Sequence, residues 1–396
     1  MKSLVQEDKK YFLNVYNRLN LEIVKGEGSY LYDGKGNKYL DMFSGISVNN
    51  LGHDPELNQQ IIEQVQKYVH LSNFFAAEPV VNLARLLVEN TFASKVFFVN
   101  SGTEANEAAI KLARKFGRQI NEDKVELLSA NNSFHGRTCG GLSLTGQPRY
   151  QDDFRPLIPG VKNFRYNDQQ DLKDKVSDKT CAVFIEMIQG QGGVVEISQQ
   201  FIDTLVNLAE EHRFLIIVDE IQTGLGRTGD IFAFEKYGFQ PDLVTVAKSL
   251  GGGLPLGAML VSQELEDILG PGDHGSTFGG NPVACAAGEY LFSKIVNDDF
   301  RAQIQKKSQL LLNRLAALKE YYPTIINDIR GRGLMLGIDT GEYAPEVREK
   351  AMEKGLLLNV TSSSVVRLLP ALNITEDELI EFLNIFKEIL DSLKTS

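Results

Sequence analysis

The chain has 396 residues, of which 43% are apolar and 23% are charged, a composition typical of a folded globular protein with a sizeable core. Its formal net charge of −11 argues against nucleic acid or an anionic membrane surface as the main partner, because both repel negative charge. No stretch approaches the ~18 consecutive apolar residues of a membrane helix. Any anion that the chain binds must therefore meet a local positive site.

The three cysteines, Cys139, Cys181 and Cys285, are scattered and odd in number, which favours a reducing compartment over a disulfide framework. The first ten residues, MKSLVQEDKK, lack the apolar segment of a signal peptide. Both features predict a cytoplasmic protein. The histidines show no zinc-ligand spacing with one another or with the cysteines, so we predict no metal site.

The first fifty residues contain short strand-like segments separated by glycines. Asp33-Gly34-Lys35-Gly36 predicts a turn between strands over 30–32 and 38–40. A small sheet is therefore expected near the start of the chain.

From about residue 80 to 262, apolar runs of strand length alternate with segments of helical period, which indicates β-α units on a parallel sheet. Amphipathic helices are predicted over 104–118 and around 201–209. The predicted strands are 95–99, 182–185, 215–218, 243–246 and 257–261. We predict a doubly wound, mostly parallel α/β layer.

After a glycine-rich stretch around 270–280 the pattern changes. It predicts a long helix, a glycine-punctuated strand over 331–338 and a second strand around 365–369. Thr375 and Glu378 form a capping box that predicts the start of a final helix. These elements indicate a smaller α+β unit.

No internal repeat or low-complexity tract marks a domain boundary, so the limits are placed where the pattern changes. We predict a large domain over 51–282 and a small domain over 283–396, to which the N-terminal segment 1–50 also contributes.

Three polar features directly follow predicted strands, at the sheet edge where open α/β sheets bind ligands. The first is the loop Ser101-Gly102-Thr103, which leads into a helix. Free amides and the helix dipole at such a place can hold a phosphate. Taken alone, the same loop is more often an ordinary helix N-cap.

The other two features are charged. Asp219 follows the strand 215–218, where a carboxylate requires a cation or a strong donor opposite it; a structural salt bridge or a helix cap is the alternative. Lys248 ends the strand that begins at 243 and precedes three glycines, 251–253. A lysine between apolar walls can lose its proton and become a nucleophile, whereas a solvated surface lysine is the alternative.

Together the three features fit one cofactor, pyridoxal phosphate, which requires a phosphate cradle, a lysine for its aldehyde and a carboxylate for its pyridine nitrogen. The segment 224–229 also matches the G-x-G-x-x-G pattern of dinucleotide-binding proteins. It lies several residues beyond its strand and no amphipathic helix opens from it, so we do not predict a nicotinamide site.

Longer runs resemble the class III aminotransferases, which depend on pyridoxal 5'-phosphate and have fold type I. Within that class, the chain is most similar to the acetylornithine aminotransferases. The resemblance implies a large domain with a mostly parallel sheet and a small α+β domain built from both chain ends. It is carried, in order along the chain, by residues 101–106, 134–138, 218–224, 247–253, 276–282 and 330–334.

The resemblance also implies roles for residues around the cofactor ring. Lys248 would bond the cofactor covalently and carry the proton during transamination. Asp219 would hold the pyridine nitrogen, and Gln222 would bind the phenolic oxygen. Phe134 and Ile221 would lie on the two faces of the ring.

The phosphate would be cradled by Ser101, Gly102 and Thr103. Thr277 from a neighbouring subunit would join them, so the resemblance implies a homodimer with shared active sites.

An ω-aminotransferase must accept two kinds of substrate in one site, because glutamate and 2-oxoglutarate carry a carboxylate on the reacting carbon and the ω-amino donor does not. By resemblance, Arg137 would bind the distal carboxylate and Arg367 the carboxylate beside the reacting carbon. Glu186 would neutralise Arg367 when the ω-amine is bound. Ser276 is assigned to the substrate site as well.

Ile46 stands where ornithine aminotransferases have a tyrosine, which favours an acylated donor over free ornithine. The implied reaction is N2-acetylornithine with 2-oxoglutarate, giving N-acetylglutamate 5-semialdehyde and glutamate in arginine biosynthesis. Met187 and Gln191 depart from the class pattern and leave the acyl preference open. The alternatives are an ω-aminotransferase for succinylornithine, ornithine, acyl-lysine or aminoadipate, or 4-aminobutyrate, and a non-catalytic binding protein with this fold.

Overall fold

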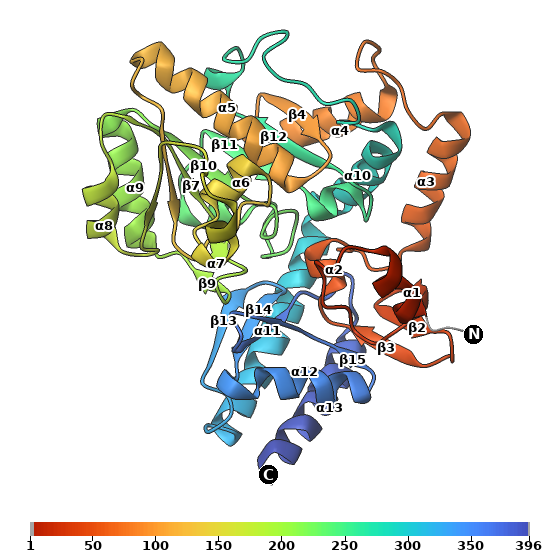
Figure 1. The fold of residues 1–396 in the computed structure, drawn as a ribbon. Coiled ribbons are helices and arrows are strands. Elements are labelled where there is room, and N and C mark those ends of the chain that lie inside the picture. Colours follow the sequence, from red (N-terminus) through yellow and green to blue (C-terminus); the bar gives the residue numbers. More distant parts are fainter. Residues whose placement is uncertain (1–3, 395–396) are drawn as a thin grey trace.

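The computed structural model describes residues 4–394 and consists of two parts (Figure 1). A layered α/β part is built from the middle of the chain, and a second part combines segments from both chain ends. None of the helices in residues 4–394 is long and apolar enough to cross a membrane. In the same range, no three His, Cys, Asp or Glu side chains gather as a metal site would require.

The central sheet of the α/β part has seven strands in the order β4-β12-β11-β10-β7-β5-β6. β12 runs antiparallel to both of its neighbours, and the other pairs are parallel. The mostly parallel sheet is therefore confirmed. Its strands are β4 (Lys95–Val99), β5 (Glu126–Ala130), β6 (Val161–Phe164), β7 (Thr180–Ile185), β10 (Leu215–Asp219), β11 (Leu243–Val246) and β12 (Gly257–Val261).

Helices cover both faces of this sheet, and neighbouring residues of a strand alternate between two apolar cores. In β10, Ile216 and Val218 pack into the core beneath α4, α9 and α10, whereas Leu215 and Ile217 pack into the core beneath α5. Every residue of β10 is buried, as expected for a strand with helices on both sides. The helices of the molecule are α1 (Leu4–Tyr11), α2 (Ser44–Ser47), α3 (Pro55–Lys67), α4 (Glu78–Glu89), α5 (Gly102–Ile120), α6 (Cys139–Leu144), α7 (Pro148–Gln151), α8 (Gln169–Lys175), α9 (Gln199–His212), α10 (Pro282–Ile295), α11 (Asp298–Tyr321), α12 (Ala344–Glu353) and α13 (Glu376–Lys394).

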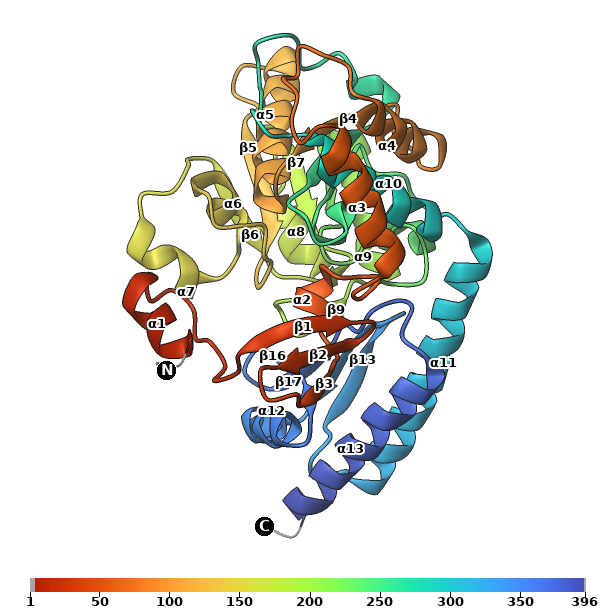
Figure 2. The same cartoon turned by 90° about the vertical axis from the view of Figure 1, so that its right-hand side faces the viewer.

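The second part contains two four-stranded sheets, and the long helices α11 and α13 lie along it (Figure 2). One sheet, in the order β1-β2-β3-β15, pairs the C-terminal strand β15 with the N-terminal strand β3. The other has the order β13-β14-β17-β16. The domain limits at 50 and 282 stay a prediction. The strands of these two sheets are β1 (Ile23–Glu27), β2 (Tyr30–Asp33), β3 (Lys38–Asp41), β13 (Asp328–Arg332), β14 (Met335–Asp339), β15 (Leu356–Leu357), β16 (Asn359–Thr361) and β17 (Val365–Leu368). A separate two-stranded sheet consists of β8 (Ile188–Gln189) and β9 (Val195–Glu196).

Two local predictions are confirmed and one is wrong. The turn at 33–36 joins β2 and β3, and Thr375 and Glu378 form the reciprocal capping bonds at the start of α13. The single strand predicted over 331–338 is instead a hairpin of β13 and β14. Gly333 turns the chain there with φ of +61°, a value that glycine adopts without strain.

Candidate active site

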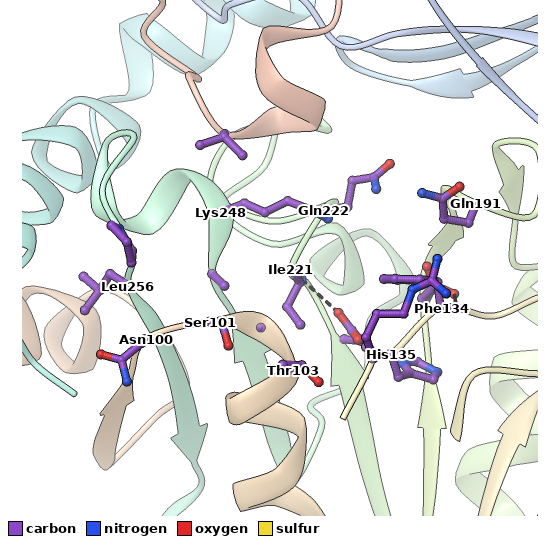
Figure 3. Close-up of a pocket in the computed structure, with 18 of the residues that line it drawn as sticks. Asn100, Ser101, Thr103, Phe134, His135, Gln191, Ile221, Gln222, Lys248 and Leu256 are labelled. Carbon is purple, nitrogen blue, oxygen red and sulfur yellow. Dashed lines mark hydrogen bonds and ion pairs between the residues drawn. The ribbon is translucent and has the colours of Figure 1, made fainter. Parts of the chain in front are cut away.

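A cavity of about 440 Å³ lies at the carboxyl ends of β4, β10 and β11, below the N-terminal segment that follows α2 (Figure 3). Open α/β sheets form their ligand sites at this edge. The sequence-predicted residues that line the cavity are Ser101, Gly102, Thr103, Phe134, Arg137, Glu186, Asp219, Ile221, Gln222 and Lys248.

Lys248 enters the cavity directly after β11, among the apolar side chains of Ala247, Leu254 and Leu256. Its backbone φ is +49°, which is uncommon for a residue other than glycine and is typical of functional sites. Burial lowers the pKa of Lys248 to about 8, against the opposing charges of Asp219 and Glu186. A larger fraction of this amine is therefore neutral, and nucleophilic, near pH 7 than in an ordinary lysine.

Asp219 ends β10 and is held by three donors. Its Oδ1 accepts a hydrogen bond from the Ile221 backbone amide at 3.1 Å. Its Oδ2 accepts from Asn106 Nδ2 at 2.9 Å and from Nδ1 of the fully buried His135 at 2.8 Å. Although burial opposes protonation of His135, Asp219 raises the pKa of that imidazole above its ordinary value. These contacts fix the carboxylate in one orientation, toward the cavity that it lines.

The loop at the start of α5 fits the predicted phosphate cradle. Ser101 caps α5, and its hydroxyl accepts from the Glu104 amide at 3.3 Å, so the N-cap interpretation also holds for this residue. A Cβ on Gly102 would lie 2.6 Å from Ile221 Cδ1, which means that only glycine allows Ile221 to pack so closely. The Thr103 hydroxyl is 2.8 Å from that of Thr138.

These residues fit pyridoxal phosphate. The cavity brings together a lysine with a lowered pKa, a buried carboxylate and a helix N-terminus, and Phe134 and Ile221 also line it. When bound, the cofactor supplies an electron-withdrawing ring that stabilises negative charge on the substrate carbon. With the cofactor bound, the residues of the cavity would hold that ring, Asp219 would lie opposite its nitrogen and Lys248 would move protons.

Arg137 stacks on an aromatic surface. Its guanidinium carbon lies 3.9 Å from the ring centroid of Tyr150 and 5.5 Å from that of Phe134. Across residues 4–394 no carboxylate forms an ion pair with Arg137. A cation–π contact fixes the guanidinium without neutralising it, so its charge remains available to an anionic ligand.

Glu186 lines the cavity, Arg367 lies behind the lining residue Gln222, and the two form no ion pair among the described residues. Arg367 is 1% exposed, and its Nη1 donates to Gln222 Oε1 at 3.0 Å. Glu186 Oε2 accepts from the Phe134 amide at 3.1 Å. Burial raises the pKa of Glu186 to about 7 and lowers that of Arg367 to about 10.

Three predicted residues are not among those that line the cavity of their own chain: Arg367, Ser276 and Thr277. Ser276 is adjacent to it, because its Oγ accepts from Nδ2 of the cavity residue Asn100 at 3.1 Å. Thr277 is exposed on the same loop.

Sequence reasoning missed several cavity residues. Val48, Asn100 and the segment 254–256 line the cavity but belong to no recognised chemical pattern. The segment 254–256 directly follows the three glycines near Lys248, and this proximity in sequence could have indicated that it lines the cavity. His135 belongs to the run 134–138 that resembles the family, but no sequence pattern pairs it with Asp219.

Known proteins are similar to this chain over nearly its whole length. The profile of the family described as Aminotransferase class-III matches residues 12–390. The acetylornithine aminotransferase of Caldanaerobacter subterraneus subsp. tengcongensis is 43% identical over 99% of this chain and 100% of its own length. That of Clostridium acetobutylicum is 44% identical over 96% of this chain and 99% of its own.

Solved structures agree with this fold. An ornithine aminotransferase from Toxoplasma gondii ME49 superposes with a TM-score of 0.94 at 29% identity, over 99% of this chain and 95% of that one. An N-acetylornithine aminotransferase from Stenotrophomonas maltophilia K279a gives a TM-score of 0.85 at 32% identity, over 99% and 100%. This chain therefore belongs to the class III aminotransferases and is a pyridoxal-phosphate-dependent enzyme of fold type I.

Proposed function

We propose that the protein transfers the ω-amino group of N2-acetylornithine to 2-oxoglutarate, giving N-acetylglutamate 5-semialdehyde and glutamate in arginine biosynthesis. The observation that carries this proposal is the 40–44% identity to acetylornithine aminotransferases over at least 96% of the chain. The cavity supports it, because it combines the lysine, the carboxylate and an arginine that a transaminase for dicarboxylates requires.

In this proposal Lys248 bonds the cofactor and moves the proton, and Asp219 holds the pyridine nitrogen. Arg137 binds the distal carboxylate of each substrate, and Arg367 binds the carboxylate beside the reacting carbon of glutamate. Glu186 offsets the charge of Arg367 when the ω-amine is bound. Its pKa of about 7 keeps it close to the point at which it gains or loses that charge.

The remaining cofactor contacts are proposed in the same way. Gln222 binds the phenolic oxygen, Phe134 and Ile221 enclose the ring, and Ser276 belongs to the substrate site. The loop from Ser101 to Thr103 holds the phosphate.

We also propose a homodimer in which Thr277 completes the phosphate site of the partner. Exposed aromatic side chains surround this loop: Phe74 is 95% exposed and Phe278 is 59% exposed. The two segments are tied by a hydrogen bond from Asn73 to the Ser276 carbonyl. Such an exposed apolar region is typical of a protein interface, and we propose the cytoplasm as the compartment because all three cysteines are free.

Ornithine is the second candidate donor, because the fold superposes on an ornithine aminotransferase with a TM-score of 0.94. Ile46 disfavours ornithine as the donor. Its side chain packs against an apolar cluster that includes Ile188 and Val365, and it offers no hydroxyl to a free α-amino group.

A donor panel with 2-oxoglutarate tests the proposal. We expect kcat/KM for N2-acetylornithine to exceed that for ornithine and 4-aminobutyrate at least tenfold, with succinylornithine measured alongside to resolve the acyl preference. A higher kcat/KM for ornithine would overturn the proposed donor. A protein that binds the cofactor but transaminates no donor would favour the non-catalytic alternative.

A further inference from the structure

Arg367 is a buried cation whose hydrogen bonds, within the part of the chain that the structure describes, go to neutral oxygens. Its Nε and Nη2 both donate to Oδ1 of Asn359, at 3.1 and 2.6 Å. Its Nη1 donates to Oε1 of Gln222 at 3.0 Å. An unpaired buried charge is costly, so these amide oxygens stabilise the guanidinium in place of a carboxylate.

The contact with Asn359 is built into a hairpin. Asn359 and Arg367 are direct cross-strand partners of β16 and β17, so their side chains leave the sheet on the same face. The turn after β16 is tied down, because the hydroxyls of Thr361 and Ser362 both donate to the Gln191 carbonyl at 3.0 Å. The position of Asn359 beside the guanidinium therefore follows from the strand register.

This arrangement leaves part of the guanidinium free. An arginine side chain has five N–H donors, and Asn359 and Gln222 take three of them. One donor remains on each terminal nitrogen of Arg367. A carboxylate that faces both terminal nitrogens can accept from both, and the two amide side chains hold the guanidinium plane in place.

The neutrality of Asn359 is essential to this role. An aspartate of nearly the same shape would pair with Arg367 permanently and compete with a substrate carboxylate. The ω-amino donor carries no carboxylate on its reacting carbon, so this competition would weaken only the binding of glutamate and 2-oxoglutarate.

We propose that Asn359 is a specificity-determining positioning residue that holds Arg367 ready for the carboxylate beside the reacting carbon without neutralising it. The inference rests on the proposed function, in which Arg367 binds that carboxylate. It adds a residue that decides how well one enzyme accepts two differently charged substrates.

The test compares Asn359→Asp with Asn313→Asp in the holoenzyme. Asn313 is exposed on α11, so its variant adds the same charge away from the site. For Asn359→Asp we expect KM for glutamate and 2-oxoglutarate to rise at least tenfold, and KM for the ω-amino donor to change less than twofold. The dissociation constant of glutarate, an inert dicarboxylate, should rise at least tenfold by calorimetry. Asn313→Asp should match the parent in all three.

Asn359→Ala is the second variant, and thermal unfolding and cofactor absorbance verify that each variant folds. We expect Asn359→Ala to raise KM for glutamate at least threefold, again sparing the ω-amino donor. The inference is overturned if either folded variant weakens both substrates equally or leaves glutarate binding unchanged.

Arg367→Gln distinguishes a failure of the inference about Asn359 from a failure of the proposed role of Arg367. If it raises KM for glutamate while the Asn359 variants do not, the inference about Asn359 alone is wrong. If Arg367→Gln also leaves KM for glutamate unchanged, the proposed role of Arg367 is wrong.

Discussion

The lowered pKa of Lys248 predicts how fast the apoprotein captures its cofactor as the pH changes. The neutral amine is the nucleophile. Burial and Arg367 lower the pKa of Lys248 to about 8, while Asp219 and Glu186 oppose the shift. The capture rate should therefore rise about tenfold per pH unit below pH 8 and level off above it.

The size of the effect follows from that value. With a pKa of about 8, roughly a tenth of the side chains are neutral at pH 7, against about 1 in 3000 for an ordinary lysine. The structure thus gives Lys248 about 300 times more reactive amine at pH 7 than an exposed lysine has. The charge of Glu186 raises the pKa of Lys248, so Glu186→Gln should shift the midpoint of the capture-rate pH profile to lower pH.

The assay mixes apoprotein with pyridoxal phosphate at pH 6 to 10, quenches with borohydride at timed intervals and quantifies the labelled peptide that contains Lys248. A free lysine derivative is measured in parallel, and its rate should still be rising at pH 10. A capture rate that follows the free derivative, with no levelling near pH 8, would refute the reasoning from burial.

Three further substitutions test other contacts. Glu186→Gln should slow the ω-amine half-reaction more than the glutamate half-reaction, because Arg367 then loses its nearby negative charge; equal losses in stopped-flow measurements would contradict this. Tyr150→Leu removes the cation–π support of Arg137, worth about 1 kcal/mol, and should raise KM for both substrates about fivefold, whereas Tyr150→Phe should not. Arg227 is buried and donates to Ser47, Asn50 and two carbonyls, so Arg227→Met should lower the free energy of unfolding by about 3 kcal/mol or more. A urea unfolding midpoint of Arg227→Met equal to that of the parent would contradict this predicted loss of stability.

Periodicity predicts five of the seven strands of the central sheet but not how all of them run. β12 is antiparallel because only ten residues separate it from β11, too few for the crossover that a parallel neighbour requires. β5 and β6, with the sequences ELLSA and VKNF, are not predicted, because two polar residues lie in each. The hairpin of β13 and β14 resembles one continuous strand in the sequence, because apolar Leu334 lies in its turn.

The site was predictable where chemistry follows a strand directly, as at Lys248 and Asp219. It was not predictable where a contact depends on tertiary packing. His135 lies 84 residues from Asp219 in sequence, and no spacing indicates that they meet. Asn359 is only eight residues from Arg367, but their contact depends on the strand register, which a one-residue shift would abolish.

The most direct test of the account replaces Lys248 with alanine in the cofactor-loaded protein and measures transamination of N2-acetylornithine by 2-oxoglutarate. We expect kcat to fall at least about 1000-fold, because the variant loses both the nucleophile and the proton carrier, while the circular dichroism spectrum stays that of the parent. A Lys248→Ala protein that transaminates at the parental rate would contradict it.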